Sequence, residues 1–197
     1  MKFCPLFHVP SECINSNSIY AIGKKNQEEM IMNFGLTYNI PVVAMRYFNV
    51  YGTRQSLSNP YNGVVAIFAS RIKNNKPPII NEDGTQTRDF IHVKDVTSAN
   101  IKALESSKAD YQIFNVGSGK PESINEIAQK IAHLYKSNIK PEISYKIRKL
   151  DVRHCYADIS KIKNLLGWKP EVDLEKGLIE VIEWSEKKKQ AISWNML

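Results

Sequence analysis

Long hydrophobic runs and cysteines are both scarce in this sequence of 197 residues. No apolar run approaches the ~18–20 residues that cross a bilayer, so we expect no membrane span. The three cysteines (Cys4, Cys13 and Cys155) are an odd number spread widely, so no disulfide framework can be read from them. The start of the chain has no apolar stretch followed by a small-residue cleavage site. These absences predict a protein of the reducing cytoplasm rather than a secreted or membrane protein.

Acidic residues are fewer than basic ones. Twenty Asp plus Glu stand against 27 Lys plus Arg, which gives a net charge of +7 and favours an anionic partner. No stretch interleaves aromatic residues with Lys or Arg, as a groove for single-stranded nucleic acid does, so we expect no nucleic acid. Apolar residues make up 43% of the chain, which is typical of a folded globular protein.

Strand-like and helical segments alternate along the chain, which predicts an α/β fold. The apolar run 42–45 lacks alternation, and this pattern predicts a strand of a parallel sheet that is covered on both faces. Further strands are expected at 79–80, 90–93, 113–116 and near Ile143, and further helices at 64–73, 158–166 and 174–189.

Capping residues predict where several helices begin. Ser18 is placed to cap a helix that reaches about residue 38. Ser123 followed by Glu126 is a capping box at the start of a helix that reaches about residue 135. Between them, Asp95 or Thr97 is expected to open a helix whose apolar residues share one face.

A tyrosine and a lysine four residues apart suggest acid–base chemistry. Tyr20 and Lys24 fall on one face of the first predicted helix, where the ammonium group favours the phenolate. Such a tyrosine can act as a general acid or base near neutral pH. The spacing alone is weak, because Tyr145 and Lys149 repeat it and either pair is also explained as surface residues.

Four ordered motifs follow that pair: 46–55 (RYFNVYGTRQ), 82–93 (EDGTQTRDFIHV), 114–119 (FNVGSG) and 151–161 (DVRHCYADISK). With these motifs the sequence resembles the extended short-chain dehydrogenase/reductase family, in its nucleotide-sugar epimerase and dehydratase branch. The resemblance runs from about Ser18 to Trp184. Within the branch it is nearest to 4-epimerases of dTDP- and UDP-sugars.

The resemblance implies a role for each motif residue. Tyr20 takes the proton of the hydroxyl at sugar carbon 4 while NAD accepts the hydride, and a transient 4-keto sugar is formed. Lys24 binds the nicotinamide ribose, and Phe48 lies near the nicotinamide. Phe48 is equally explained as a core residue. The cofactor site implied by the family is therefore Tyr20, Lys24 and Phe48.

The resemblance also implies a site for the UDP- or dTDP-sugar. Asn49 hydrogen-bonds the sugar diphosphate, Arg88 and Arg153 grip the diphosphate, and Val64 and Ile80 flank the base. Each has a plainer reading. Val64 suits a core position, Asn49 a turn, and each arginine could pair with a neighbouring aspartate.

The sequence departs from the family at its beginning. Members open on a βαβ unit with a GxxGxxG motif, and no such motif occurs here. The expected division is an irregular remnant at 1–17, the C-terminal part of a Rossmann-like NAD-binding domain at 18–120, and a small α/β nucleotide-sugar-binding domain at 121–197. We therefore expect a truncated chain without the N-terminal βαβ cofactor unit.

Two alternatives to an active epimerase stay open. The reaction could be a dehydration instead of an epimerisation, or the chain could be an inactive interaction module. By resemblance, the helix carrying Tyr20 and Lys24 pairs with its copy in a homodimer.

Cys4, His8 and Cys13 have the residue types of a zinc site but not the paired spacing, so we predict no metal.

Overall fold

The structure is a computed structural model that describes residues 18–56, 63–147 and 152–187. Helices and strands alternate along the chain, so the predicted α/β class is confirmed. The helices are α1 (Ile19–Tyr38), α2 (Val64–Lys73), α3 (Val93–Leu104), α4 (Ile124–Leu134), α5 (Ser160–Leu166) and α6 (Leu174–Lys187), with a 3-10 turn η1 (Ser107–Ala109). The strands are β1 (Val43–Tyr47), β2 (Asn49–Tyr51), β3 (Ile79–Ile80), β4 (Thr87–His92), β5 (Gln112–Val116), β6 (Pro121–Ser123) and β7 (Glu142–Ile143).

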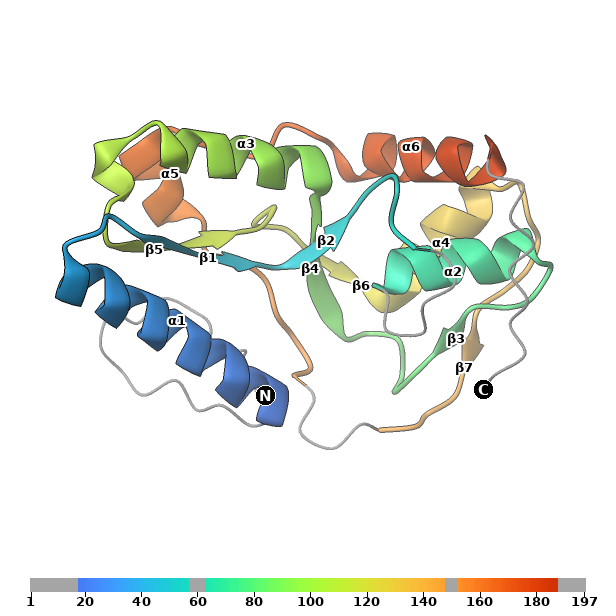
Figure 1. Ribbon diagram of the computed structural model, residues 1–197. Coiled ribbons are helices and arrows are strands. Elements are labelled where there is room, and N and C mark those ends of the chain that lie inside the picture. The colour runs from blue at the N-terminus through green and yellow to red at the C-terminus, as the bar shows by residue number, and fades with distance from the viewer. Residues whose placement is uncertain (1–17, 57–62, 148–151, 188–197) are drawn as a thin grey trace.

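The strands form mostly parallel pairs. β1 lies parallel to β5, and β2 lies parallel to β4, which continues into an antiparallel pair with β6. Strands β3 and β7 form a separate parallel pair. Figure 1 shows α1 on one side of the β1–β5 pair, with α3 and α5 on the other. This two-sided covering explains why the apolar run at the start of β1 shows no alternation.

Helix α1 begins and ends as its sequence predicts. The Ser18 side chain accepts a hydrogen bond from the backbone of Ala21 at 3.1 Å and caps the helix. At the other end Asn39 adopts the left-handed conformation, with φ at 52°, and its amide bonds Gly35. A Cβ at Gly35 would stand 2.8 Å from the carbonyl oxygen of Ile40, so glycine lets the chain turn directly into β1.

Two hydrophobic clusters form the core. One joins α2, α4 and α6 over β4, and the other joins α3, α5 and β5. The first cluster contains Phe68 and Ile127 with Leu178, and the second contains Phe114 and Trp168. Each cluster therefore takes residues from both sides of residue 120, where the sequence suggested a domain boundary.

The capping-box prediction is confirmed, and one helix start is corrected. Ser123 accepts from the Glu126 amide while the Glu126 carboxylate accepts from the Ser123 amide, so both halves of the box form. Helix α3, however, begins at Val93 and not at Asp95 or Thr97, with His92 as its N-cap. The Asp95 carboxylate instead accepts from the amides of residues 171 and 172, ahead of α6.

Strands β2 and β6 were not predicted. Each has only three residues, and their hydrophobic pattern is too short to show a period of two. Among the described residues, no helix is long and apolar enough to cross a membrane.

Glycine at position 177 allows α6 to pack on β2. A Cβ at this position would stand 2.9 Å from ring atoms Cε2 and Cζ of Tyr51 and closer still to its hydroxyl, which bonds the carbonyl of Leu174 at 3.4 Å. We expect Gly177→Ala to lower the free energy of unfolding by about 1–3 kcal/mol, because an added methyl in a packed core forces the ring to move. Urea denaturation followed by circular dichroism measures the change.

The matched control is Gly23→Ala in α1. Apart from neighbouring residues and the backbone of its own helix, no atom of the described residues lies within 4 Å of a Cβ built at Gly23, so alanine adds helix propensity without a clash. This variant is expected to be more stable by about 0.5–1 kcal/mol. Equal effects of the two substitutions would contradict the packing argument.

Candidate functional site: a tyrosine–lysine helix and an arginine cluster

Tyr20 and Lys24 lie in the first turns of α1, as the sequence predicts. The Lys24 ammonium is 5.7 Å from the centroid of the Tyr20 ring, and it also bonds the Gln27 side chain at 3.1 Å. Tyr20 is 75% exposed. The phenol and the ammonium therefore face the same space outside the described part of the protein.

Helix α1 is anchored to the sheet by one ion pair. Arg46 of β1 donates two hydrogen bonds of 2.6 Å to the Glu28 carboxylate, and both side chains are largely buried. Such a bidentate pair fixes the helix against the strand in direction as well as distance. Residues two and three positions further along, Phe48 and Asn49, follow directly from this anchored strand.

Phe48 and Asn49 lie where β1 gives way to β2. The Phe48 amide bonds the carbonyl of Val116 at 3.1 Å, and Asn49 stands opposite Phe90 in the β2–β4 pair. Both residues are half-buried. They are thus at the carboxyl end of β1, the edge at which parallel sheets bind ligands.

The two residues proposed to flank a base differ in burial. Val64 opens α2, is partly exposed and packs on the edge of the first cluster. Ile80 is only 1% exposed and belongs to that cluster itself. Contact between the Ile80 side chain and a base therefore stays a prediction, since this side chain is buried in the described structure.

A buried carboxylate organises the loop after β5. Asp89 is fully buried and accepts four hydrogen bonds, from the amide and hydroxyl of Ser118, the amide of Gly119 and the amide of Ala157, at 2.6–3.0 Å. A Cβ at Gly117 would stand 2.6 Å from this carboxylate, and Gly119 has φ at 73°. The glycines of this loop therefore form a tight turn around Asp89.

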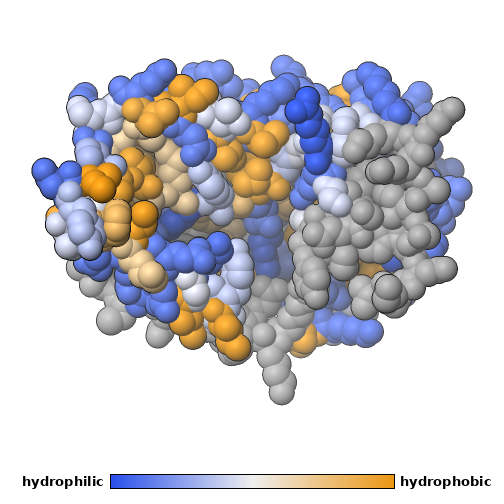
Figure 2. Space-filling view, in the orientation of Figure 1, coloured by the Kyte–Doolittle hydropathy of each residue, from blue (hydrophilic) through white to orange (hydrophobic). Residues whose placement is uncertain are grey.

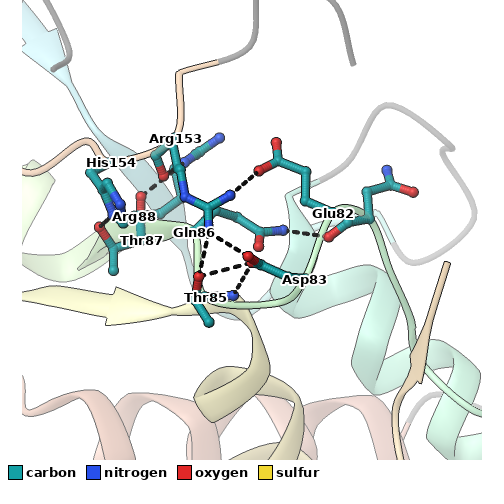
Figure 3. A network of polar contacts seen from close by, with 9 residues as sticks. Glu82, Asp83, Thr85, Gln86, Thr87, Arg88, Arg153 and His154 are labelled. Atoms are coloured by element: carbon teal, nitrogen blue, oxygen red, sulfur yellow. Dashed lines mark hydrogen bonds and ion pairs between the residues drawn. The ribbon is translucent and has the colours of Figure 1, made fainter. Parts of the chain in front are cut away.

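Arg88 and Arg153 are 65 positions apart in sequence, and the fold brings them together (Figure 3). Arg88 Nη1 donates to the carbonyl oxygen of Thr87 at 2.8 Å and to that of Arg153 at 3.1 Å. The backbone of residues 153–155 runs beside the start of β4, because the Thr87 amide and carbonyl bond residues 153 and 155. The predicted pairing of Arg88 with the neighbouring Asp89 is not seen, since that carboxylate points into its own buried loop.

The Arg153 side chain points the other way, into the turn that precedes β4. Its Nη1 is 3.2 Å from a Glu82 carboxylate oxygen, and its Nη2 bonds Thr85 Oγ1 at 2.7 Å and the Asp83 carboxylate. The Arg153 guanidinium lowers the pKa of Asp83 well below its usual value, and Asp83 in turn raises that of Arg153. Glu82 and Asp83 belong to the motif 82–93, but the sequence does not identify these carboxylates as partners of Arg153.

His92 is a buried structural residue. Its side chain is 1% exposed, its ring meets Tyr51 edge-on at 5.3 Å, and its Nδ1 accepts from the Lys94 amide at 3.4 Å. Its Nε2 has no hydrogen-bond partner among the described residues, and the nearest carboxylate oxygen, of Glu180, is 3.7 Å away. Burial lowers the pKa of His92; Glu180 and Asp95 oppose this shift, and Lys94 adds to it.

Cys4, His8 and Cys13 lie outside the described residues, so the structure does not bear on a metal site there. Within the described ranges, no group of three or more His, Cys, Asp or Glu side chains is placed to hold a metal ion.

Parallel strand pairs flanked by helices define the class of this protein as a Rossmann-like α/β fold. The family model for GDP-mannose 4,6 dehydratase matches residues 10–181. The chain therefore belongs to this family of short-chain dehydrogenase/reductase-type nucleotide-sugar epimerases and dehydratases.

Several proteins similar to this chain are epimerases. A putative UDP-glucose 4-epimerase of Methanocaldococcus jannaschii is 41% identical over 172 residues, which are 87% of this chain and 54% of that protein. The solved UDP-N-acetylglucosamine 4-epimerase of Methanobrevibacter ruminantium, in complex with UDP-N-acetylmuramic acid, is 36% identical with a TM-score of 0.84, over 92% of this chain and 58% of the other.

A third relative contains both a nucleotide sugar and a cofactor. The UDP-glucuronic acid 4-epimerase of Bacillus cereus, in complex with UDP-glucuronic acid and NAD, has 25% identity and a TM-score of 0.78, over 94% of this chain and 60% of that one. The chain spans about half the length of the curated relatives it matches.

The burial of neutral His92 predicts acid sensitivity. Between its lowered native pKa and the ordinary value of 6.5, the unfolded chain binds a proton that the folded chain does not. The free energy of unfolding therefore falls as pH falls below 6.5, by up to about 1.4 kcal/mol per pH unit. Urea midpoints measured between pH 7.5 and 5.5 test this.

His92→Gln is the comparison for that test, because glutamine keeps an acceptor for the helix cap but does not titrate in this range. The variant is expected to be less stable at pH 7.5 and to lose less stability between pH 7.5 and 5.5. Carboxylates with lowered pKa values, such as Glu126 and Glu180, respond at lower pH and do not confuse the comparison. Parallel pH profiles for the two proteins would contradict the assignment.

Proposed function

We propose that this chain carries the proton-transferring tyrosine, its partner lysine and diphosphate-binding residues of a nucleotide-sugar 4-epimerase. The observation that carries the proposal is the Tyr20–Lys24 pair, exposed on one face of α1 within a chain 41% identical to a putative UDP-glucose 4-epimerase. The substrate class is a UDP- or dTDP-sugar, and the reaction inverts the configuration at carbon 4. The predicted location is the cytoplasm, on the basis of cysteine usage.

Tyr20 is assigned the proton chemistry. It takes the proton of the hydroxyl at carbon 4 as that carbon is oxidised, and returns it to the same oxygen after the 4-keto sugar has turned over. The exposed phenol can reach a ligand outside α1, which a buried tyrosine could not. Lys24 holds its positive charge beside the ring and is assigned the ribose of the cofactor.

NAD fits this helix face, and it supplies the hydride acceptor and donor for carbon 4 when bound. The fit rests on the exposed phenol and ammonium of α1. This helix is fixed by Arg46 to strand β1, which ends one residue before Phe48. The sequence contains no GxxGxxG motif for the pyrophosphate, so this chain's own contribution is the nicotinamide end. The NAD complex of the Bacillus cereus epimerase supports the same cofactor here.

The nucleotide sugar is assigned to the carboxyl edge of the sheet. Asn49, at the start of β2, faces the sugar diphosphate, and Arg88, at the start of β4, supplies a permanent positive charge for it. Val64, at the first position of α2, is the partly exposed apolar residue proposed to contact the base.

A dehydratase is the second candidate, because the matching family model is that of GDP-mannose 4,6 dehydratase. The two reactions share oxidation at carbon 4 and differ in product. A dehydratase yields a 4-keto-6-deoxy sugar, and an epimerase yields the 4-epimer.

Tyr20→Phe is expected to slow epimerisation by about 10²–10⁴-fold, because phenylalanine keeps the ring but cannot transfer a proton. Proton NMR of the anomeric signals, with NAD supplied, measures the exchange of UDP-glucose with UDP-galactose and of the corresponding dTDP-sugars. Tyr145→Phe is the matched control, since Tyr145 is 73% exposed and also has a lysine four residues later.

Three results would count against this assignment. Formation of the 4-keto-6-deoxy product would favour the dehydratase. Full activity of the Tyr20→Phe variant would show that Tyr20 does not transfer the proton. If the native chain forms neither product, the inactive interaction module would be the better description.

A homodimer through α1 is part of the same proposal. Large apolar side chains are exposed along the helix, and Figure 2 shows hydrophobic atoms over both of its ends. A surface of this kind is typical of an interface. The most exposed, apart from Tyr20 at 75%, are Ile19 at 90%, Met30 at 71%, Tyr38 at 64% and Leu36 at 63%.

Met30→Asp is expected to convert a dimer to a monomer in sedimentation velocity, because a charge in the middle of a paired helix surface is desolvated without a partner. Ile179→Asp is the control, since Ile179 of α6 is 39% exposed but lies on another helix. A native chain that sediments as a monomer, or a Met30→Asp dimer, would contradict pairing through α1.

A further inference from the structure

Two arginines meet at the start of β4, and acidic side chains surround the guanidinium of one of them. Arg153 faces Glu82 and Asp83, and Arg88 Nη1 donates to the backbone carbonyl oxygens of residues 87 and 153. One guanidinium against two carboxylates leaves a net negative charge at the tip of Arg153. An anionic diphosphate is repelled from that point, so Arg153 is poorly placed to bind it.

Arg153 connects two segments that are far apart in the sequence. Its side chain bonds the 82–85 turn, and its backbone bonds the start of β4, where its carbonyl oxygen accepts from the Thr87 amide at 3.0 Å. The Cys155 amide then bonds the Thr87 carbonyl at 3.1 Å, and the Thr87 hydroxyl lies 3.0 Å from His154 Nδ1. We name residues 152–155 the strap, since they are tied across β4 at these points (Figure 3).

The turn that receives Arg153 is itself held in one shape. Asp83 accepts from the Thr85 amide at 2.9 Å and from the Thr85 hydroxyl at 2.8 Å. Glu82 has φ at 56°, and its amide bonds the carbonyl of Lys146 at 3.1 Å. The Asp83 carboxylate and the Glu82 backbone are thus held by contacts that do not involve Arg153, which suits the planar fork of a guanidinium.

The strap determines where Arg88 points. The carbonyl oxygen of Arg153 is one of the two acceptors of Arg88 Nη1, so a movement of residue 153 removes a hydrogen bond from the Arg88 guanidinium. Without this hydrogen bond the long Arg88 side chain can adopt more rotamers, so its guanidinium is less well oriented.

We propose that Arg153 is a positioning residue: its ion pairs with Glu82 and Asp83 tie the strap to β4 and so set the Arg88 guanidinium for a nucleoside diphosphate. This inference rests on the proposed function, in which Arg88 is the diphosphate-binding residue. It is an alternative to the expectation from the sequence that both arginines bind the diphosphate. Arg153 acts through its backbone and through Arg88, without touching the ligand.

The two roles of Arg153 predict opposite effects when the carboxylates are removed. If Arg153 bound the diphosphate directly, Glu82→Gln with Asp83→Asn would release its side chain and tighten binding. If Arg153 positions Arg88, the same double variant loosens the strap and weakens binding. The sign of the change therefore separates the two roles.

The experiment is a calorimetric titration of UDP into the full chain and its variants. We expect E82Q/D83N and Arg153→Ala each to weaken UDP binding by about tenfold, as loss of an aligned charge-assisted contact does. The triple variant is expected to be no weaker than either, because all three residues act through one contact. Arg153→Lys keeps the charge but not the planar fork, and an intermediate loss is expected.

The control for charge is E29Q/E105Q, which also removes two carboxylates from the surface. Glu29 pairs with Lys25 on α1, and Glu105 is exposed at the end of α3. This variant changes net charge by the same amount as E82Q/D83N. It is expected to leave UDP affinity within about twofold or to raise it slightly by long-range attraction.

Hydrogen exchange of the Thr87 and Cys155 amides provides a second measurement that needs no ligand. Both amides bond across the strap, so their exchange is expected to speed up by about tenfold in E82Q/D83N and Arg153→Ala but not in E29Q/E105Q. Unchanged exchange in the first two variants overturns the inference, and so does tighter UDP binding by E82Q/D83N.

The outcomes also separate this inference from the proposed function. If the native chain does not bind UDP while exchange rises as expected, the strap is upheld and the assignment of Arg88 to a nucleoside diphosphate fails. If the native chain binds UDP and Arg88→Ala abolishes binding while E82Q/D83N does not change it, the proposed site stands and the role of Arg153 fails.

Discussion

One buried carboxylate holds three segments of this fold together. Asp89 of β4 is fully withdrawn from water, and its oxygens accept from Ser118, Gly119 and Ala157, which belong to the loop after β5 and the segment before α5. An unpaired carboxylate would be very costly at this depth, so these donors must stay in place for the chain to fold. This constraint fixes the loop after β5 and the segment before α5 relative to β4.

Arg88 and Thr87, which precede Asp89 in β4, lie on the strand that these hydrogen bonds hold in place. Arg88 points out of the sheet, toward the carbonyl oxygen of Arg153. The Ala157 amide bonds Asp89 at one end of a segment whose other end, the strap, bonds Thr87. The same strand thus binds this segment twice, once through a buried carboxylate and once at the surface. The surface attachment depends on exposed charges and is the easier of the two to change.

Much of the fold follows from local sequence signals. The Ser18 cap, the Ser123–Glu126 capping box and the apolar run of β1 each predict an element that the structure contains. These signals succeed because a cap or a buried strand is specified by neighbours in the sequence. Helix α3 was misplaced because the carboxylate of Asp95, a good capping group, is used 76 residues away on the Glu171 amide. That tertiary contact has no local signature.

The candidate site shows the same limit at the level of single residues. Tyr20 and Lys24 are one helical turn apart, so their spacing alone brings them together on α1. The partners of Arg153, by contrast, lie 68–71 residues earlier in the chain, and only the fold shows that they neutralise it. A match to a family motif shows which residue occupies a position, but it does not show the charges that surround that residue in the fold. Those charges affect whether a diphosphate can approach it. In this chain the acidic turn places two carboxylates at the Arg153 guanidinium, which the motifs alone do not show.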